Sequence, residues 1–179
     1  PDQIEALAAL TREAHDLGLP VLAMTYARGP GVDEHAVESL AHAVRLGEEL
    51  GADVMKTAYS RDDRFDEVTA ATDRPVIVAG GSPRDDRTML SQVADALAAG
   101  AAGVSMGRSI FQHDRPEAIT RAVSGLVHHD LSVDAAAGPA AHTPSGRPPR
   151  SAPPARPPAW RARRPRAPPP HARGRRQAR

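Results

Sequence analysis

Two patterns of apolar residues alternate along the first 134 residues of the chain. Short, uninterrupted apolar runs predict buried strands, and they lie at residues 20–26, 53–57, 75–79 and 103–106. Apolar residues at the helical spacing i, i+3, i+4, i+7 predict helices, at about residues 3–17, 33–50, 62–72, 85–99 and 116–128. The alternation of strand and helix predicts four consecutive βα units.

The ends of the helices also carry recognisable signals. The first helix places its apolar residues on one stripe, which we expect to face inward: Ile4, Leu7, Ala8, Ala14 and Leu17. Gly18 is expected to end that helix, because glycine accepts the left-handed conformation of a helix terminus. Asp33 is a candidate N-cap for the second helix, and Asp85 or Asp86 for the fourth.

The predicted strands are apolar throughout rather than alternating, which is typical of a parallel α/β sheet covered on both faces. A doubly wound sheet and a (β/α)8 barrel both fit this order. The strand ends favour the barrel, because polar or glycine residues follow every strand: Tyr26, then Lys56, then Gly80-Gly81-Ser82, then Gly107-Arg108-Ser109. In a barrel, that face carries the active site.

Charge divides the chain into two parts. Residues 135–179, called the tail here, contain 11 arginines and no acidic residue, so they carry a charge of +11. The remaining 12 basic residues and all 22 acidic residues lie in residues 1–134, which therefore carry a charge of −10. The tail is also rich in proline and alanine, so we expect it to be disordered. Such runs also arise when GC-rich DNA is read out of frame, which is a second hypothesis for the tail.

Several classes of protein are disfavoured by what the sequence lacks. It contains no cysteine, which excludes disulfide frameworks and thiolate metal sites and agrees with a cytoplasmic location. No apolar run has the ~20 residues needed to span a bilayer, and no signal peptide is recognisable, so we expect no membrane partner. The chain starts at Pro1 and enters a helix almost at once, so we expect it to be part of a longer domain.

Lys56 is the sole lysine, in a chain that otherwise uses arginine for positive charge. A lysine can lose its proton and act as a nucleophile, whereas arginine stays charged. A lone amine at the end of a core strand is what Schiff-base chemistry with a carbonyl substrate requires. The alternative is a chance lysine in a GC-rich coding sequence.

The glycines after the last two predicted strands are candidates for a phosphate site. Gly80, Gly81 and Ser82 follow the third strand, and Gly107 and Arg108 follow the fourth. Backbone N–H groups of such loops approach anions closely, and the loops after the last two strands of a barrel commonly hold phosphate. The alternative is that these glycines only make tight turns.

Four segments together resemble the archaeal-type class I aldolase family: Ala23-Met-Thr-Tyr26-Ala-Arg28-Gly-Pro30, Leu50-Gly-Ala-Asp-Val-Met-Lys56-Thr57, Pro75-Val-Ile-Val-Ala-Gly80-Gly81, and Ala101-Ala-Gly-Val-Ser-Met-Gly107-Arg108. That family includes fructose-bisphosphate aldolase, 2-amino-3,7-dideoxy-D-threo-hept-6-ulosonate synthase and the autoinducer-2 thiolase. The resemblance covers residues 1 to about 130. It implies a TIM barrel of which this chain holds the C-terminal four βα units.

The resemblance also implies roles for individual residues. Lys56 would form the Schiff base, Tyr26 would donate a proton, and Arg28 would contact the substrate. The glycines and Arg108 named above would hold the substrate phosphate. It implies neither a cofactor nor a metal, and we expect the histidines, such as His113, to lie on the surface. The family's catalytic aspartate belongs to the first strand of the barrel, which has no counterpart here.

Three functional hypotheses follow. The first is a class I aldolase acting on a phosphorylated sugar, of the fructose-bisphosphate aldolase type, with the heptulosonate synthase as the alternative. The second is an inactive barrel fragment that associates through its open edges, and a homo-oligomer is expected in either case. The third is nucleic-acid binding through the arginines of the tail, which is disfavoured because Trp160 is the only aromatic residue there.

Overall fold

The computed structural model describes residues 2–60, 63–80 and 85–138, and all of them belong to one compact unit, Pro1–Arg147. Two predicted phosphate-binding residues, Gly81 and Ser82, lie outside the described residues, as does the tail from residue 139. No helix in the described ranges is long and apolar enough to cross a membrane.

Four parallel strands form the sheet, in the order β1-β2-β3-β4. Their bounds are Leu22–Met24 (β1), Val54–Thr57 (β2), Val76–Ala79 (β3) and Gly103–Ser105 (β4). The register places Met24 beside Lys56, and Lys56 beside Ile77. The four predicted strands and the parallel α/β class are confirmed.

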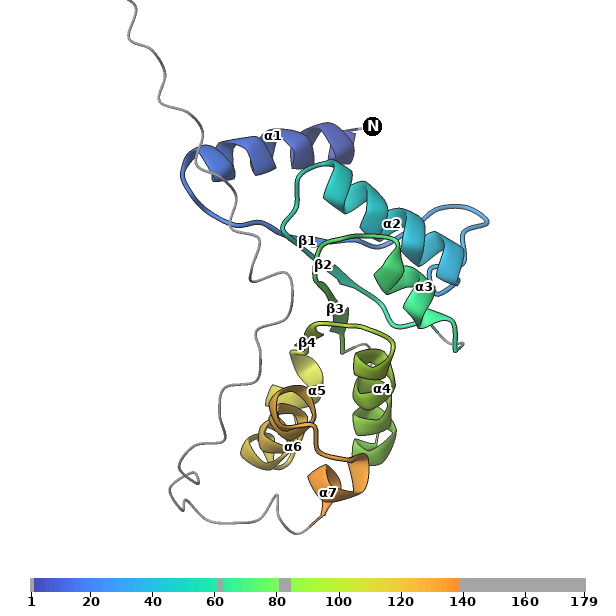
Figure 1. Cartoon of the computed structure of the whole chain (residues 1–179), viewed down its shortest axis with the longest axis vertical. Coiled ribbons are helices and arrows are strands. Elements are labelled where there is room, and N and C mark those ends of the chain that lie inside the picture. The colour runs from blue at the N-terminus through green and yellow to red at the C-terminus, as the bar shows by residue number, and fades with distance from the viewer. Residues whose placement is uncertain (1, 61–62, 81–84, 139–179) are drawn as a thin grey trace, which may run out of the picture. The chain divides into compact units, whose positions relative to one another are not determined.

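Helices connect and follow the strands (Figure 1). They are α1 (Asp2–Asp16), α2 (Val37–Glu49), α3 (Phe65–Ala70), α4 (Asp86–Ala98), α5 (Arg108–Phe111), α6 (Pro116–His129) and α7 (Val133–Ala137). Helices α5 and α7 were not predicted, because each is about one turn long and too short to show a periodic pattern. The Ser132 hydroxyl caps α7 by accepting from the amide of Ala135, and Ala136 is buried. The first residues assigned to the tail are therefore helical.

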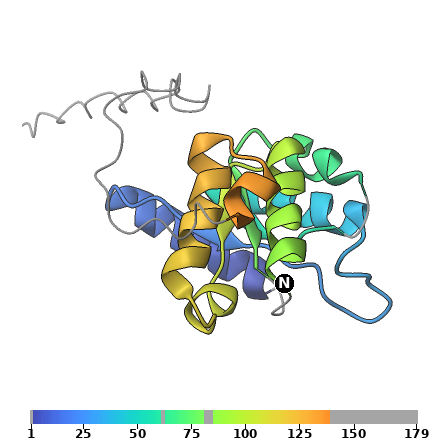
Figure 2. The ribbon, with the colours of Figure 1, turned by 90° about the horizontal axis from the view of Figure 1, so that it is seen from below.

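The apolar core consists of two clusters on the helix-covered side of the sheet. The first joins α2 and α3 to the strands through Leu40, Val44, Met55, Phe65 and Val68. The second joins α4, α6 and α7, and its members include Leu90, Val93, Ile119, Leu126 and Ala136. Figure 1 shows these two groups of helices at opposite ends of the sheet, and Figure 2 shows the same elements from below.

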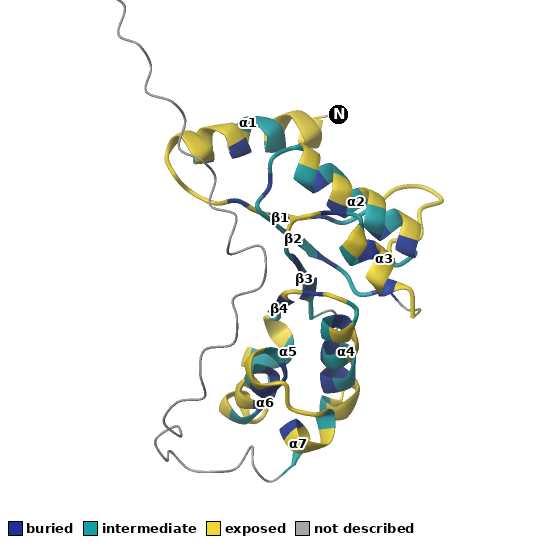
Figure 3. Cartoon of the chain, in the orientation of Figure 1, coloured by how far each residue is buried: buried dark blue, intermediate teal, exposed yellow. Residues whose placement is uncertain are grey.

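Burial of the strand residues differs between the two faces of the sheet (Figure 3). Successive side chains of a strand point to opposite faces. Ala23, Met55 and Val78 are buried against the helices, whereas Leu22 and Met24 on the other face remain 48% and 68% exposed. The described strands are therefore covered by helices on one face, as expected for the outer helices of a barrel. The exposed face is the one that would line the inside of a closed barrel.

Two predictions about helix ends and faces are wrong. The apolar stripe of α1 is not buried, since Ile4 is 43% and Leu17 75% exposed, and the buried residue of this helix is Thr11. Asp33 does not cap α2, because the helix begins four residues later; its carboxylate accepts instead from the amide of His35. The expected turn at Gly18 is confirmed by its φ of 74°.

Polar side chains join neighbouring segments at the amino ends of the strands. The Asp53 carboxylate accepts from the Val21 amide at 2.8 Å and from His15 Nε2 at 2.9 Å. Burial acts to raise the pKa of Asp53, but these hydrogen bonds and nearby positive charge outweigh it and hold the pKa below its ordinary value of 3.8. The Thr11 hydroxyl donates to the Leu50 carbonyl at 2.6 Å and ties α1 to the end of α2.

Candidate active site

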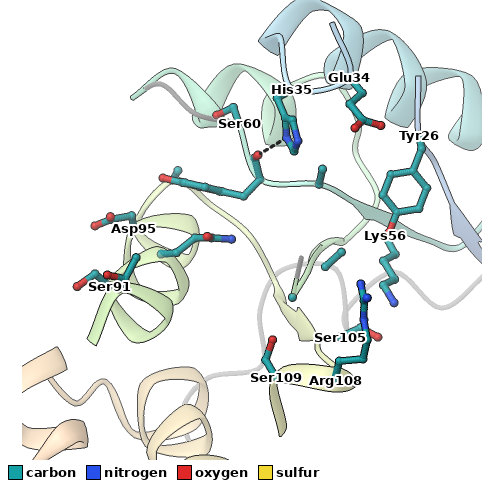
Figure 4. A pocket seen from close by; sticks show the side chains of 18 of the residues that line it. Tyr26, Glu34, His35, Lys56, Ser60, Ser91, Asp95, Ser105, Arg108 and Ser109 are labelled. Carbon is teal, nitrogen blue, oxygen red and sulfur yellow. Dashed lines mark hydrogen bonds between the residues drawn. The ribbon is translucent and has the colours of Figure 1, made fainter. Parts of the chain in front are cut away.

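A pocket of about 1600 Å³ opens at the carboxyl ends of the strands (Figure 4). Each of the four strands contributes to its lining, through Tyr26 after β1, Lys56 on β2, Gly80 after β3 and Gly107 after β4. Arg28 and Arg108 also line it. The structure therefore brings together every predicted site residue that lies within the described ranges.

Lys56 reaches the pocket because of its place in the strand. Its neighbours Met55 and Thr57 are both 0% exposed and pack under the helices. The alternation of side chains then directs Lys56 to the opposite, open face, where its side chain is partly buried and projects into the pocket. An amine in this position is held by a rigid strand and remains accessible to a ligand.

Tyr26 lies two residues beyond the end of β1, and its side chain enters the same pocket as that of Lys56. Burial raises the pKa of the Tyr26 hydroxyl above its ordinary value of 10.0, and the positive charge of Arg28 offsets part of this effect. The hydroxyl therefore keeps its proton at neutral pH. It can act as a proton donor.

Arg28 occupies the rim of the pocket. Its guanidinium carbon lies 5.4 Å from the centre of the Tyr26 ring, within the range of a cation–π contact. Its Nε lies 3.4 Å from a carboxylate oxygen of Glu34, and its side chain is 73% exposed. A substrate group that used Arg28 would therefore have to compete with Glu34 and with water.

The two described glycines of the candidate phosphate site lie in tightly packed places. A Cβ atom at Gly80 would approach Met106 Cγ to 3.0 Å, and one at Gly107 would approach Phe111 Cε1 to 3.1 Å. These contacts give a packing reason for glycine at both positions. Arg108 begins α5 directly after Gly107 and lines the pocket. The guanidinium of Arg108 and the backbone of Gly107 therefore both border the pocket at the end of β4.

Sequence reasoning did not predict several polar residues that line the pocket, among them His35, Ser60 and Ser105. Ser105 is paired in register with Ala79, so strand alternation alone could have placed it on the open face. His35 lies in the β1–α2 loop, and its Nδ1 is 3.2 Å from the Tyr59 carbonyl oxygen. No sequence pattern indicated that contact, because it joins residues from two different loops.

The prediction that His113 lies free on the surface is wrong. Its side chain is 19% exposed, and its Nε2 lies 2.8 Å from a carboxylate oxygen of Asp86. Its Nδ1 accepts from the amide of Arg115 at 2.9 Å. His113 therefore connects the segment after α5 to the first turn of α4. In the described ranges, no group of three or more histidine and carboxylate side chains is arranged to hold a metal ion.

Comparison with known proteins identifies relatives of this arrangement. Residues 1–113 match the family model described as DeoC/LacD family aldolase. The chain is 57% identical over 137 residues to the 2-amino-3,7-dideoxy-D-threo-hept-6-ulosonate synthase of Halobacterium salinarum, covering 76% of this chain and 52% of that protein. It is 43% identical over 148 residues to the 2-amino-4,5-dihydroxy-6-oxo-7-(phosphonooxy)heptanoate synthase of Streptomyces griseus, covering 77% and 52%.

Solved structures show the same fold. An archaeal fructose 1,6-bisphosphate aldolase superposes with a TM-score of 0.66 and 37% identity, covering 69% of this chain and 51% of that chain. A second archaeal fructose-1,6-bisphosphate aldolase, whose catalytic lysine is covalently bound to a carbinolamine intermediate, superposes with a TM-score of 0.66 and 34% identity.

The chain spans about half the length of the curated relatives and solved structures that it matches. Its four parallel βα units are accordingly half of a TIM barrel of the aldolase type, as the resemblance implied. The match of the family model, the superposition and the identity to the curated synthases agree. The chain belongs to the DeoC/LacD family of aldolases.

Proposed function

We propose that this chain carries the Schiff-base half of a class I aldolase of the heptulosonate-synthase type. The observation that carries the proposal is the 57% identity to the Halobacterium salinarum synthase, because it covers 76% of this chain. The fructose-bisphosphate aldolase type, which the sequence alone favoured, becomes the second candidate.

In the proposed first step, the neutral amine of Lys56 attacks the ketone carbon of a phosphorylated ketose. A carbinolamine forms, and the former ketone oxygen leaves as water with one proton from the nitrogen and one from an acid in the pocket. The resulting C=N⁺ group draws the electron pair of the neighbouring carbon–carbon bond toward nitrogen. As this bond breaks, the hydroxyl on the departing carbon gives up its proton and becomes the carbonyl of an aldehyde, and an enamine remains on Lys56. The reverse sequence forms a new bond to an aldehyde.

Tyr26 is proposed to transfer the proton of the oxygen that is bonded to the aldehyde carbon, at the carbon–carbon bond that breaks or forms. It enters the same pocket as Lys56, and its raised pKa keeps the proton on the hydroxyl until the substrate oxygen gains charge. Arg108 and the loops at Gly80 and Gly107 are proposed to hold the substrate phosphate, because a guanidinium forms strong, charge-assisted hydrogen bonds with phosphate.

The names of the two synthases define the bond that such an enzyme would make. Both names describe a seven-carbon acid with an amino group on C2 and a ketone on C6. Schiff-base chemistry at that ketone forms the bond between C4 and C5 of the product. Carbons 5 to 7 then come from a three-carbon enamine, and carbons 1 to 4 come from an aldehyde, which is 2-amino-4-oxobutanoate. The Streptomyces name places a phosphate on C7, in the enamine fragment. The Halobacterium name makes C7 a deoxy position, so a phosphate on that donor would lie on the fragment that is released. We therefore propose a phosphorylated ketose as donor and an amino-aldehyde acid as acceptor.

Fructose-bisphosphate cleavage remains the second candidate because the archaeal aldolases share the fold at 34% and 37% identity. The two candidates differ in the acceptor aldehyde. A fructose-bisphosphate aldolase accepts glyceraldehyde 3-phosphate, which has no amino group and carries a second phosphate.

The test has two stages. The chain is first incubated with a phosphorylated ketose and borohydride, which adds hydride to the C=N carbon and fixes the sugar fragment on the lysine. Mass spectrometry of the digested chain should find the label on Lys56; label elsewhere, or none, would refute the Schiff-base role. For the second stage, the chain is completed to a full barrel with the missing half taken from a relative, and both aldehydes are offered in competition without borohydride. A product containing the amino acid favours the synthase, whereas the bisphosphate product favours the second candidate.

A further inference from the structure

We infer that Thr57 is a positioning residue that fixes the spacing between Lys56 and Tyr26 through the Thr25 carbonyl. The inference rests on the proposed function, since it concerns the two residues assigned to the chemistry there. Thr57 directly follows Lys56 and Thr25 directly precedes Tyr26. The pair is called the threonine latch below.

Two hydrogen bonds make the latch. The Thr25 amide donates to the Lys56 carbonyl at 2.8 Å, and the Thr57 hydroxyl donates to the Thr25 carbonyl at 3.1 Å. The carbonyl of the Lys56–Thr57 peptide group therefore holds the amide of Thr25, and the side chain of Thr57 holds the carbonyl of the Thr25–Tyr26 peptide group. The Thr25 hydroxyl supports this arrangement by donating to the Lys56 carbonyl at 3.4 Å. Each of the two functional residues contributes one of these peptide groups, so the latch acts directly on the backbone that carries them.

The latch lies where the ordinary strand pairing stops. The paired part of β1 ends at Met24, whereas β2 continues through Thr57. Tyr26 is therefore beyond the last paired residue of its strand, and further backbone pairing does not set its position. The hydroxyl of Thr57 extends the connection past that end. A threonine suits this task because its branched side chain has few allowed rotamers.

Packing holds both threonines in place. Thr57 is 0% and Thr25 7% exposed, and Thr25 lies beneath Gly47 of α2. A Cβ atom at Gly47 would approach Thr25 Cγ2 to 2.9 Å and Met55 Cγ to 3.1 Å, so the helix sits directly against the latch. The latch therefore cannot move without also displacing α2.

A simpler interpretation is that Thr57 only satisfies its own buried hydroxyl. Thr11 provides a matched comparison within the same chain. It is 2% exposed, and its hydroxyl donates to the Leu50 carbonyl at 2.6 Å, at the opposite end of the sheet from the pocket. If Thr57 were only structural, removing either hydroxyl would have the same kind of consequence. The positioning role predicts a consequence for Lys56 that removal of the Thr11 hydroxyl does not share.

The experiment uses the full chain and three variants. Thr57→Val keeps the branched shape but removes the donor, Thr57→Ser keeps the donor, and Thr11→Val is the control. The rate constant of borohydride-trapped adduct formation on Lys56 is measured at saturating phosphorylated ketose. We expect a loss of about tenfold or more in Thr57→Val, because small misplacements of a reacting group are costly. The rate constant in Thr57→Ser should stay within about threefold of that in the original chain. The ketose concentration at half-saturation should be unchanged in both Thr57 variants.

A second readout does not depend on activity. Since Lys56 is the sole lysine, labelling with ¹⁵N-lysine gives one backbone amide signal in an NMR spectrum. That signal should shift or broaden in Thr57→Val and remain in place in Thr11→Val, while both variants lose similar thermal stability. If no chain forms an adduct but the signal responds in this way, the proposed function fails and the latch stands. Equal adduct rates in Thr57→Val and Thr11→Val, or an unmoved Lys56 signal, would overturn the latch.

Discussion

The two ends of the sheet use polar residues in opposite ways. At the amino ends, Asp53 and Thr11 have protein partners: Asp53 binds Val21 and His15, and Thr11 binds the Leu50 carbonyl. The hydroxyl of Thr69, on α3, likewise donates to a backbone carbonyl, that of Ala99 at the end of α4, at 2.6 Å. At the carboxyl ends, the side chains of Lys56 and Arg108 project instead into an open pocket.

This difference separates stability from chemistry within one half-barrel. Polar groups bonded to the protein hold helices and strands together, whereas polar groups facing a pocket remain available to a ligand. The same division is found in TIM barrels generally, where catalytic residues lie at the carboxyl ends and the opposite face serves stability. Substitutions at the two ends should therefore affect different measurements, and the predictions below test that separation.

The largest effect is expected for Lys56→Arg. Arginine keeps the positive charge but cannot supply a neutral amine, so borohydride trapping with a phosphorylated ketose should be abolished. The melting temperature should change little, because the side chain is only partly buried in the pocket. Trapping that persists elsewhere on the chain would show that the carboxyl end is not where the chemistry takes place.

The next effect concerns complete turnover. We expect the chain by itself to show little or no aldol cleavage or synthesis, because four strands leave the pocket without the remaining half of the barrel and catalytic groups need a rigid frame. The open face and neighbouring segments expose Leu19, Leu22 and Met24, so the purified chain should also elute as a species larger than a monomer. A monomer with normal turnover and a cooperative melt would refute both expectations.

A smaller effect is expected for Arg108→Ala. Loss of a charged hydrogen bond should weaken the binding of a phosphorylated ketose by roughly 1.5–3 kcal/mol, measured by calorimetry. The control is Arg45→Ala, because Arg45 lies on the exposed side of α2 and pairs with Glu49 at 2.9 Å. An unchanged dissociation constant in Arg108→Ala would favour the interpretation that the glycines at Gly80 and Gly107 only make turns.

Much of the fold and most of the site were predictable because they depend on local patterns. Apolar runs marked the strands, and parallel strands bring their carboxyl ends to one edge of the sheet. The sequence alone therefore predicted that Tyr26, Lys56 and Gly107 lie close together. Asp85 was a correct cap for α4, since its carboxylate accepts from the Thr88 amide at 2.9 Å.

The missed features depend on contacts between distant segments. The bond between His113 and Asp86 joins the segment after α5 to the first residue of α4, and no spacing in the sequence indicates it. The stripe on α1 was periodic, yet only Leu7 of its leucines packs against the core, and the buried residue of this helix is Thr11. Periodicity identifies a helix, but the partners that the fold provides decide which face is buried.

The smallest effect is expected at the amino ends, for Asp53→Asn. The amide can still accept from Val21 but loses the charge that favours His15, so the free energy of unfolding should fall by about 0.5–1 kcal/mol at neutral pH, the scale of a partly exposed ion pair. Because the folded protein holds the pKa of Asp53 below its ordinary 3.8, the wild-type advantage should be complete above that pH and disappear as the pH falls through the lower, folded value. Denaturation curves of both chains across this range measure the effect, and borohydride trapping on Lys56 should be identical in the two. A change in trapping would mean that the two ends of the sheet are coupled. A difference in the free energy of unfolding that persists at low pH would mean that Asp53 stabilises the fold by its shape rather than by its charge.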